Sequence, residues 1–235
     1  MGTYNGSRYV ERQLRSILNQ LDQADEVIVV DDHSSDTTLD VVKKINDSRI
    51  KIDRKESNEG VLRTFERAIR LASGDIIFLS DQDDIWYPEK VRCFLQAFDK
   101  HPEVTLILSD TKVINDADEV VAESFFKGLG GYSPRLLHNI VKNKHLGCAM
   151  AFRRCMVEKF LPFPVDIPQH DIWMGCVNSI YGKPLFLNSP LMAYRRHRYN
   201  ASPIKRQGLV RILVWRWKLI KNLSLRFMLL NRRVH

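Results

Sequence analysis

One stretch in the first half of the chain constrains the fold more than any other, because an apolar run is followed at once by clustered acids. Residues 75–90 read DIIFLSDQDDIWYPEK. The apolar run Ile76–Leu79 is too short for a helix and is typical of a buried strand in a parallel sheet. Three carboxylates then leave the end of this strand within four residues: Asp81, Asp83 and Asp84.

These three acids repel one another unless a cation or hydrogen-bond donors hold them. In open α/β sheets, ligands bind beyond the carboxyl ends of the strands. A divalent metal bound by one or two carboxylates plus substrate phosphates would satisfy such a cluster. The alternative is a solvated acidic turn that caps the next helix, since Pro88 fits the first turn of a helix over 89–100.

Short strands and amphipathic helices alternate through the first half of the chain. Strands are expected at 26–30, 49–53 and 104–108, with helices between them, and this alternation predicts a doubly wound α/β sheet. Asp32 stands where the first of these strands ends. The tripeptide Asn58-Glu59-Gly60 precedes a helix and, taken alone, is more often only a turn.

The second half has weaker patterns. Between residues 111 and 144 the periodicity fades and glycines predict a flexible span. This span is either a region that recognises a substrate or a surface insertion. Asp171 opens a helix and is either its N-cap or a carboxylate that accepts a proton. The segment 194–200, with Arg195 and His197, is either a ligand-binding cluster or a solvated basic edge.

In this order, the motifs resemble those of the family 2 glycosyltransferases, the inverting GT-A enzymes, and above all their rhamnosyltransferase-like subgroup. The resemblance covers most of residues 2–202 and is carried by MGTYNG, SGDIIFLSDQDDIWYPEKV, HLGCAMAF, HDIW and YRRHRYN. It implies a GT-A domain over 1–202, with a Rossmann-like, mostly parallel sheet flanked by helices. The first strand of that sheet is apparently missing. A basic amphipathic helical tail over 203–235 follows.

The resemblance also implies roles for individual residues. Asp171 corresponds to the catalytic base that deprotonates the acceptor hydroxyl. The implied ligands of a divalent metal, Mg²⁺ or Mn²⁺, are Asp81, Asp83, Asp84 and His197. The implied contacts to the nucleotide are Thr3, Tyr4, Asn5, Asp32, Asn58, Gly60 and Asp81. The implied contacts to the diphosphate or the acceptor are Arg195, Gly147, Cys148, His170 and Trp173.

The activity implied by the resemblance is metal-dependent, inverting transfer of a sugar, rhamnose or another hexose, in the synthesis of cell-surface polysaccharide. The donor would be a dTDP- or UDP-sugar and the acceptor a saccharide, free or lipid-linked. A non-catalytic module that binds a nucleotide sugar or a partner is the alternative, because the missing first strand should carry part of the nucleotide pocket.

Charge is unevenly distributed along the chain, which has a net charge of +8. After Asp171 there are 13 basic and no acidic residues, whereas the part up to Asp171 has a net charge of −5. A uniformly basic nucleic-acid binder is therefore disfavoured. In the tail, cations alternate with Trp215, Trp217 and aliphatic residues, which suits an anionic membrane surface. Packing on the chain's own domain or on a second subunit is the competing interpretation.

The four cysteines have no paired short spacing, and the sequence shows no signal peptide. Neither a disulfide framework nor a zinc motif is indicated, which fits a reducing compartment. We therefore expect a cytoplasmic protein, peripheral on the inner face of the cell membrane.

Overall fold

The computed structural model describes residues 1–167, 169–197 and 208–231. The strands are β1 (Gly2–Thr3), β2 (Val27–Asp31), β3 (Ile50–Arg54), β4 (Ile76–Phe78), β5 (Ile85–Trp86), β6 (Leu106–Ile114), β7 (Val120–Ala122), β8 (Met150–Arg153) and β9 (Pro184–Arg195). The α-helices are α1 (Val10–Leu18), α2 (Thr38–Ile45), α3 (Val61–Leu71), α4 (Lys90–Lys100), α5 (Phe125–Gly128), α6 (Leu136–Val141), α7 (Val157–Phe160), α8 (His170–Tyr181) and α9 (Leu209–Asn231). Two 3₁₀ turns are η1 (Gly147–Ala149) and η2 (Arg154–Met156).

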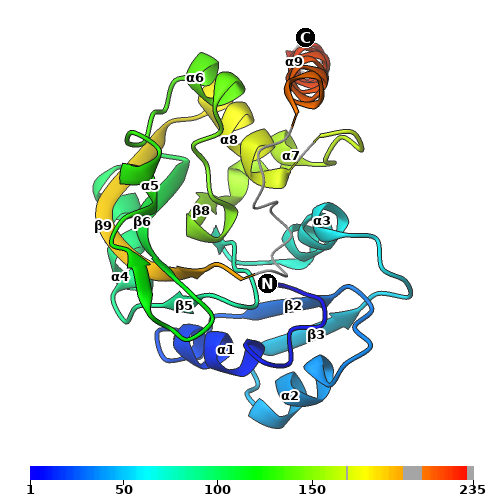
Figure 1. The fold of residues 1–235 in the computed structure, drawn as a ribbon, viewed down its shortest axis with the longest axis vertical. Helices are drawn as coiled ribbons and strands as arrows, with labels where there is room; N and C mark the ends of the chain where they lie inside the picture. Colours follow the sequence, from blue (N-terminus) through cyan, green and yellow to red (C-terminus); the bar gives the residue numbers. More distant parts are fainter. Residues whose placement is uncertain (168, 198–207, 232–235) are drawn as a thin grey trace.

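The first sheet is parallel throughout, with the order β1-β2-β3. Helices α1 and α2 lie on one side of it and α3 on the other (Figure 1). The β-branched run of β2 is buried along its whole length, and α3 buries Phe65, Ala68 and Ile69. The βα units expected from the sequence are therefore present, and the α/β class is confirmed.

The second sheet is mixed, with the order β4-β8-β6-β9-β5 and with β7 paired to β6. Only β6 and β9 run parallel in it, and β4 pairs antiparallel with β8. The prediction that Ile76–Leu79 belongs to a parallel sheet is therefore wrong. Its apolar run shows burial, and burial does not distinguish a parallel partner from an antiparallel one that arrives from a distant part of the chain.

The two sheets meet at a very short strand, β1. The N-terminal amine of Met1 donates to the carbonyl of Ile28 at 2.7 Å, and Gly2 N lies 3.4 Å from Ser80 O. Burial lowers the pKa of this amine to about 5. Beside it, side chains of β2, α3 and β4 line a mainly apolar cleft of roughly 350 Å³. A two-residue strand thus stands where the resemblance leads one to expect a longer one.

The span 111–144 is more regular than predicted. Strand β6 continues to Ile114, turns into β7, and is followed by α5 and α6. Asp110 helps to fix this arrangement, because its carboxylate accepts hydrogen bonds from Ser124 Oγ and Phe126 N. Of the glycines that suggested flexibility, Gly128 ends α5, whereas Gly130 and Gly131 follow it with positive φ angles of 78° and 81°.

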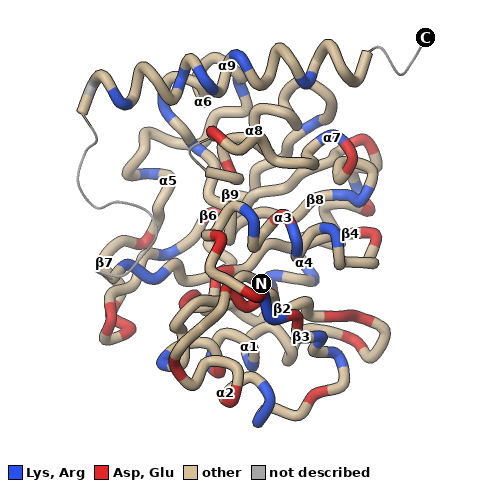
Figure 2. Tube along the Cα trace, turned by 90° about the vertical axis from the view of Figure 1, so that its right-hand side faces the viewer, with Lys and Arg blue, Asp and Glu red and all other residues tan. Residues whose placement is uncertain are grey.

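Helix α9 crosses one end of the molecule and carries basic but no acidic residues (Figure 2). Its inner face buries Leu219 and Leu223 in the core cluster that includes Trp173. Arg226 is buried and donates to the carbonyls of Lys159 and Leu161. No helix in the described part of the chain has the length and apolar content needed to cross a membrane.

Candidate active site

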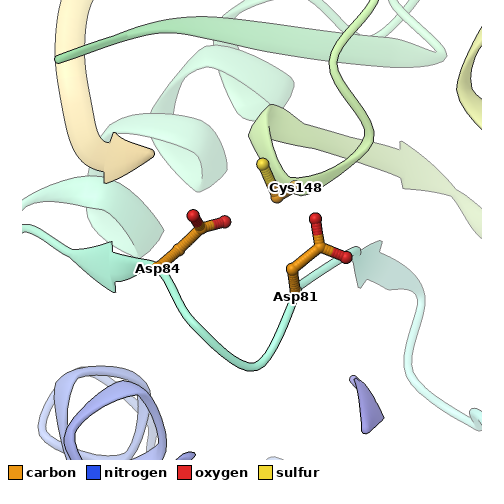
Figure 3. A group of neighbouring side chains, drawn as sticks. All are labelled: Asp81, Asp84 and Cys148. Carbon is orange, nitrogen blue, oxygen red and sulfur yellow. The ribbon is translucent and has the colours of Figure 1, made fainter. Parts of the chain in front are cut away.

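The loop between β4 and β5 brings its acids against η1, so that three potential metal ligands gather at one point. The carboxylates of Asp81 and Asp84 point toward the sulfur of Cys148 (Figure 3). One ligand atom from each of these residues lies within 4.8 Å of the other two. The sequence grouped Asp81 with Asp84, but it assigned Cys148 to the diphosphate or acceptor instead.

The electrostatics of this cluster favour a cation. Burial, together with the neighbouring carboxylates of Asp83 and Asp171, raises the pKa of Asp81 to about 7. Burial and the same crowding by Asp83 and Asp81 raise the pKa of Asp84 well above its usual value. Asp84 Oδ1 accepts from Arg195 N at 3.0 Å, whereas its buried Oδ2 has no hydrogen-bond partner among the described residues. A divalent cation fits this excess of carboxylate oxygen.

Asp83 and His197, both predicted metal ligands, instead contact each other. His197 Nε2 lies 2.8 Å from Asp83 Oδ2, and the histidine ring stacks on Tyr9 with the ring centroids 5.1 Å apart. In this arrangement the ring nitrogen contacts the carboxylate of Asp83, and metal ligation by these two residues stays a prediction. Asp83 still adds negative charge to the cluster, because it raises the pKa of both neighbouring acids.

Arg195 was predicted to hold the diphosphate, and the structure assigns it a different task. Its Nε donates to Asp83 O and its Nη1 to Asn115 O, each at 2.8 Å. It also forms an ion pair with Asp118. The side chain is buried, and these contacts tie β9 to the acidic loop and to the β6–β7 turn. We therefore do not assign Arg195 to the diphosphate.

Asp171 lies in the first turn of α8, and the N-cap of that helix is Gln169. Its Oδ1 accepts from Ile172 N at 2.6 Å. Burial raises the pKa of Asp171 to about 6, although hydrogen bonds from Ile172 N and the Asn143 side chain oppose the shift. Asp171 also raises the pKa of Asp81, so the two carboxyl groups lie close enough for their charges to interact. A carboxylate with a pKa near neutrality suits a general base.

The neighbours of Asp171 have structural tasks. His170 is buried and stacks on Phe65 with the ring centroids 4.2 Å apart. A Cβ at position 147 would lie 2.5 Å from His170 Nε2, so Gly147 makes room for this ring rather than for a sugar. Trp173 is fully buried and donates from Nε1 to Phe160 O. Packing thus accounts for Gly147 and Trp173, and their contacts to the acceptor stay a prediction.

The residues predicted to contact the nucleotide lie along one edge. Thr3 Oγ1 donates to Asp31 Oδ1 at 3.0 Å, and Tyr4 exchanges backbone hydrogen bonds with the Gln82 side chain. Asn5 Oδ1 accepts from Ser35 N at 2.9 Å. The strand ends of β1 and β2 and the acidic loop after β4 are thus held together, as the shared sheet edge predicts.

Asp32 is the best-satisfied acid at this edge. Its carboxylate accepts from Lys55 Nζ at 2.7 Å, from Glu59 N at 2.9 Å and from Gly60 N at 2.8 Å. Burial alone would raise its pKa, but these donors lower it below the usual value. Asp32 therefore anchors the Asn58-Glu59-Gly60 turn, while Asn58 itself is exposed.

Sequence reasoning missed two buried lysines. Lys55 neutralises Asp32, and Lys90 Nζ donates to Cys148 O at 2.9 Å while lying 4.3 Å from the centre of the Trp86 ring. Burial lowers the pKa of Lys90 to about 8. Both lysines stand in polar stretches that read as exposed, so the sequence offered no signal beyond their position next to predicted site motifs.

Comparison with known proteins places this geometry in a family. The family model described as "Glycosyl transferase family 2" matches residues 1–160. The chain belongs to glycosyl transferase family 2. It is 27% identical over 212 residues to an uncharacterised glycosyltransferase of Nostoc, covering 85% of this chain and 64% of that protein. It is also 26% identical over 247 residues to the dTDP-rhamnosyl transferase RfbG of Shigella flexneri, covering 90% of this chain and 79% of RfbG.

A solved structure supports the fold assignment. The crystal structure of Staphylococcus aureus TarS residues 1–349 in complex with UDP-GlcNAc matches with a TM-score of 0.74 at 21% identity, over 96% of this chain and 64% of that one. This likeness confirms the GT-A class expected from the sequence. The chain spans just under two thirds of both the Nostoc relative and the TarS structure.

Proposed function

We propose that this chain transfers a sugar, with inversion, from a nucleoside diphosphate donor to a hydroxyl of a saccharide acceptor, in the presence of Mg²⁺ or Mn²⁺. The observation that carries the proposal is the crowded carboxylate cluster of Asp81 and Asp84, with one unsatisfied oxygen on Asp84, together with the buried carboxylate of Asp171, whose charge raises the pKa of Asp81. The naming of one relative as a dTDP-rhamnosyl transferase and the UDP-GlcNAc bound to TarS support a dTDP- or UDP-sugar donor.

The residues divide the chemistry between them. Asp81 and Asp84 would hold the divalent cation, which when bound supplies positive charge to the departing diphosphate. Asp171 accepts the proton of the acceptor hydroxyl as that oxygen bonds to the anomeric carbon. The bond from the anomeric carbon to the diphosphate oxygen breaks on the opposite side, so the configuration inverts. Burial keeps the Asp171 carboxylate basic enough for this task at neutral pH.

The nucleoside half of the donor would lie along the edge formed by Thr3, Tyr4 and Asn5 and by the turn 58–60. We assign Asp32 a positioning role there, because its carboxylate is already bonded to Lys55 and to the backbone of that turn. His170 remains a candidate acceptor contact through its Nε2, which is buried and has no partner among the described residues.

The outer face of α9 supports a second part of the proposal, peripheral binding to the anionic cytoplasmic face of the cell membrane. Apolar side chains project from this face along the whole helix and are exposed: Val210, Leu213, Val214, Trp217, Ile220 and Met228. Exposed Arg211 and Lys221 accompany them. An apolar helix face with flanking cations suits a lipid surface. A lipid-linked saccharide acceptor in polysaccharide synthesis would then lie in the same plane as the enzyme.

Point variants test the membrane contact better than truncation, because α9 also covers the core through Leu219 and Leu223. We expect Trp217→Glu combined with Met228→Glu to abolish flotation with vesicles that contain phosphatidylserine. The matched control is Val121→Glu on β7, where the residue is 60% exposed against 62% for Trp217. Flotation that survives the double variant would remove the membrane contact from α9.

The transfer reaction is tested with a panel of dTDP- and UDP-sugars, saccharide acceptors and Mn²⁺. We expect one donor to give a product whose anomeric configuration, read by NMR, is opposite to that of the donor. A product with retained configuration would contradict the role of Asp171. Tight binding of nucleoside diphosphate without turnover of any donor would favour the non-catalytic binding module instead.

A further inference from the structure

The metal-binding cluster contains a sulfur atom beside its carboxylate oxygens. Cys148 comes from η1, far in sequence from Asp81 and Asp84, yet its Sγ lies within 4.8 Å of a ligand oxygen of each (Figure 3). Cys148 and Asp84 are each only 1% exposed. Buried cysteines usually act as small apolar residues, whereas this thiol interacts with buried carboxylates and hydrogen-bonds to Asp84.

A second observation points to a ligand at this place. Asp84 Oδ2 is buried and has no hydrogen-bond partner among the described residues, while Oδ1 is occupied by Arg195 N. A buried carboxylate oxygen without a donor is unfavourable unless something positive completes it. A carboxylate oxygen of Asp84 and the thiol sulfur lie within 4.8 Å of each other, a separation that one cation bound between them can bridge.

The backbone of the 3₁₀ turn that carries the sulfur is held in place by neighbouring residues. Lys90 Nζ donates to the carbonyl of Cys148, and Ala149 N donates to Leu146 O across the 3₁₀ turn. Gly147 packs directly against the His170 ring, where no Cβ would fit. These three contacts fix the backbone of the turn that carries the thiol.

We propose that Cys148 binds the divalent cation through its thiolate sulfur and makes this site prefer thiophilic cations such as Zn²⁺ and Cd²⁺ over Mg²⁺. The inference rests on the proposed function only in that Asp81 and Asp84 are taken to hold a cation. Carboxylate oxygens suit Mg²⁺ and Mn²⁺, whereas a thiolate adds affinity for softer metals. On binding, the S–H bond breaks, a sulfur–metal bond forms, and one proton leaves to the solvent.

A consequence for the proposed enzyme is competition between cations. Two oxygens and one sulfur provide three protein ligands, the number typical of a zinc site that keeps one position open. Zn²⁺ would therefore occupy the same place as Mn²⁺ and displace it. Cys148 thereby determines which cations the site retains, without itself touching the sugar.

The test uses the complete protein and Cd²⁺ alone, with ultraviolet absorption as the readout. We expect Cd²⁺ to produce a thiolate-to-metal charge-transfer band in the wild type. Cys148→Ser should abolish the band and weaken Cd²⁺ binding at least about tenfold, the lower end of what losing even an outer-shell partner costs a metal site. Cys176→Ser, which alters another buried cysteine, should keep both the band and the affinity.

Mn²⁺-dependent binding of UDP or dTDP separates this inference from the proposed function. The wild-type protein should bind UDP or dTDP in a Mn²⁺-dependent manner, because carboxylate oxygens suit Mn²⁺. If wild-type protein shows no Mn²⁺-dependent nucleotide binding, the proposed function fails. If that binding is intact but the Cd²⁺ band is absent, or persists in Cys148→Ser, only the role of Cys148 fails.

A measurement on the wild type removes any dependence on how the variants fold. X-ray absorption at the zinc edge of the Zn²⁺-loaded protein should show one sulfur neighbour at about 2.3 Å together with oxygen neighbours at about 2.0–2.2 Å. A first shell of oxygen and nitrogen alone would overturn the proposal.

Discussion

Two acidic loops follow buried strands in this molecule, and their carboxylates have opposite surroundings. After β2, Asp32 accepts hydrogen bonds from Lys55 and from two backbone amides, and its pKa is lowered. After β4, Asp81 and Asp84 lie close to each other and to Asp83, and the pKa values of Asp81 and Asp84 are raised. The sequences of the loops are alike in kind, so the difference comes from the donors that the rest of the fold supplies.

The comparison distinguishes a structural acid from a functional one. A buried carboxylate that already has its donors contributes to holding a turn, as Asp32 does for residues 58–60. A buried carboxylate with an empty oxygen is unfavourable by itself and becomes favourable when a cation binds. Acid clustering in a sequence identifies both kinds alike, and only the surrounding contacts separate them.

The largest expected effect concerns Asp171, whose charge raises the pKa of Asp81 in the loop after β4. It is not among the causes of the pKa shift of Asp32. We expect Asp171→Asn to lower the rate of transfer about 10²–10⁴-fold, because the amide cannot accept the acceptor proton. Binding of Mn²⁺ and the nucleotide should stay close to wild type. Steady-state kinetics measure the rate of transfer, and calorimetry measures the binding of Mn²⁺ and the nucleotide. A near-normal rate of transfer would show that Asp171 is not the base.

Lys55→Met removes the cation that pairs with Asp32. The carboxylate after β2 would then lack a neutralising partner, like the carboxylates after β4. We expect the free energy of unfolding to fall by about 3–5 kcal/mol, since removal of one partner leaves a buried charge without compensation. The control is Lys51→Met, whose ion pair with Glu26 leaves the lysine exposed and should contribute less than about 1 kcal/mol. Equal small losses in denaturant unfolding would mean that Asp32 is satisfied without Lys55.

The pH dependence of transfer should follow the raised pKa of Asp171. A base is active only when deprotonated, so the rate should decline below a pH of about 6. The decline should approach about tenfold per pH unit, as expected for one essential proton acceptor. Asp32, with its lowered pKa, should stay ionised through this range and contribute no decline. A kcat/KM profile that is flat between pH 5 and 7 would contradict the assignment.

Much of the fold and part of the site could be predicted from the sequence. The run Ile76–Leu79 indicated a buried strand and Asp81–Asp84 a ligand-binding end, because apolar length and acid clustering are local properties. The antiparallel partner of that strand could not be predicted, since β8 lies some 70 residues further along the chain. The hydrogen bonds from Arg195 to two backbone carbonyls could not be predicted either, because they require three distant segments of the chain to meet.

The resemblance to the family assigned roles to residues but did not predict their contacts. It identified Asp171, whose environment suits a base, but it also assigned Gly147 and Trp173 to the acceptor, whereas they serve packing. The position of Cys148 beside the carboxylates was not predicted. It arises because η1 folds against the β4–β5 loop, and the residues around Cys148 in the sequence gave no indication of this.

The most direct test compares Asp84→Asn with Asp32→Asn in denaturant unfolding at pH 7.5, with and without Mn²⁺ and UDP. Ionisation of Asp84 is less favourable in the folded than in the unfolded chain, so its neutral variant should be at least as stable as wild type without cation. Ionisation of Asp32 favours folding, so Asp32→Asn should be less stable. Mn²⁺ with UDP should then stabilise the wild type and Asp32→Asn but not Asp84→Asn. The opposite order of stabilities, with equal stabilisation of all three proteins, would contradict the account.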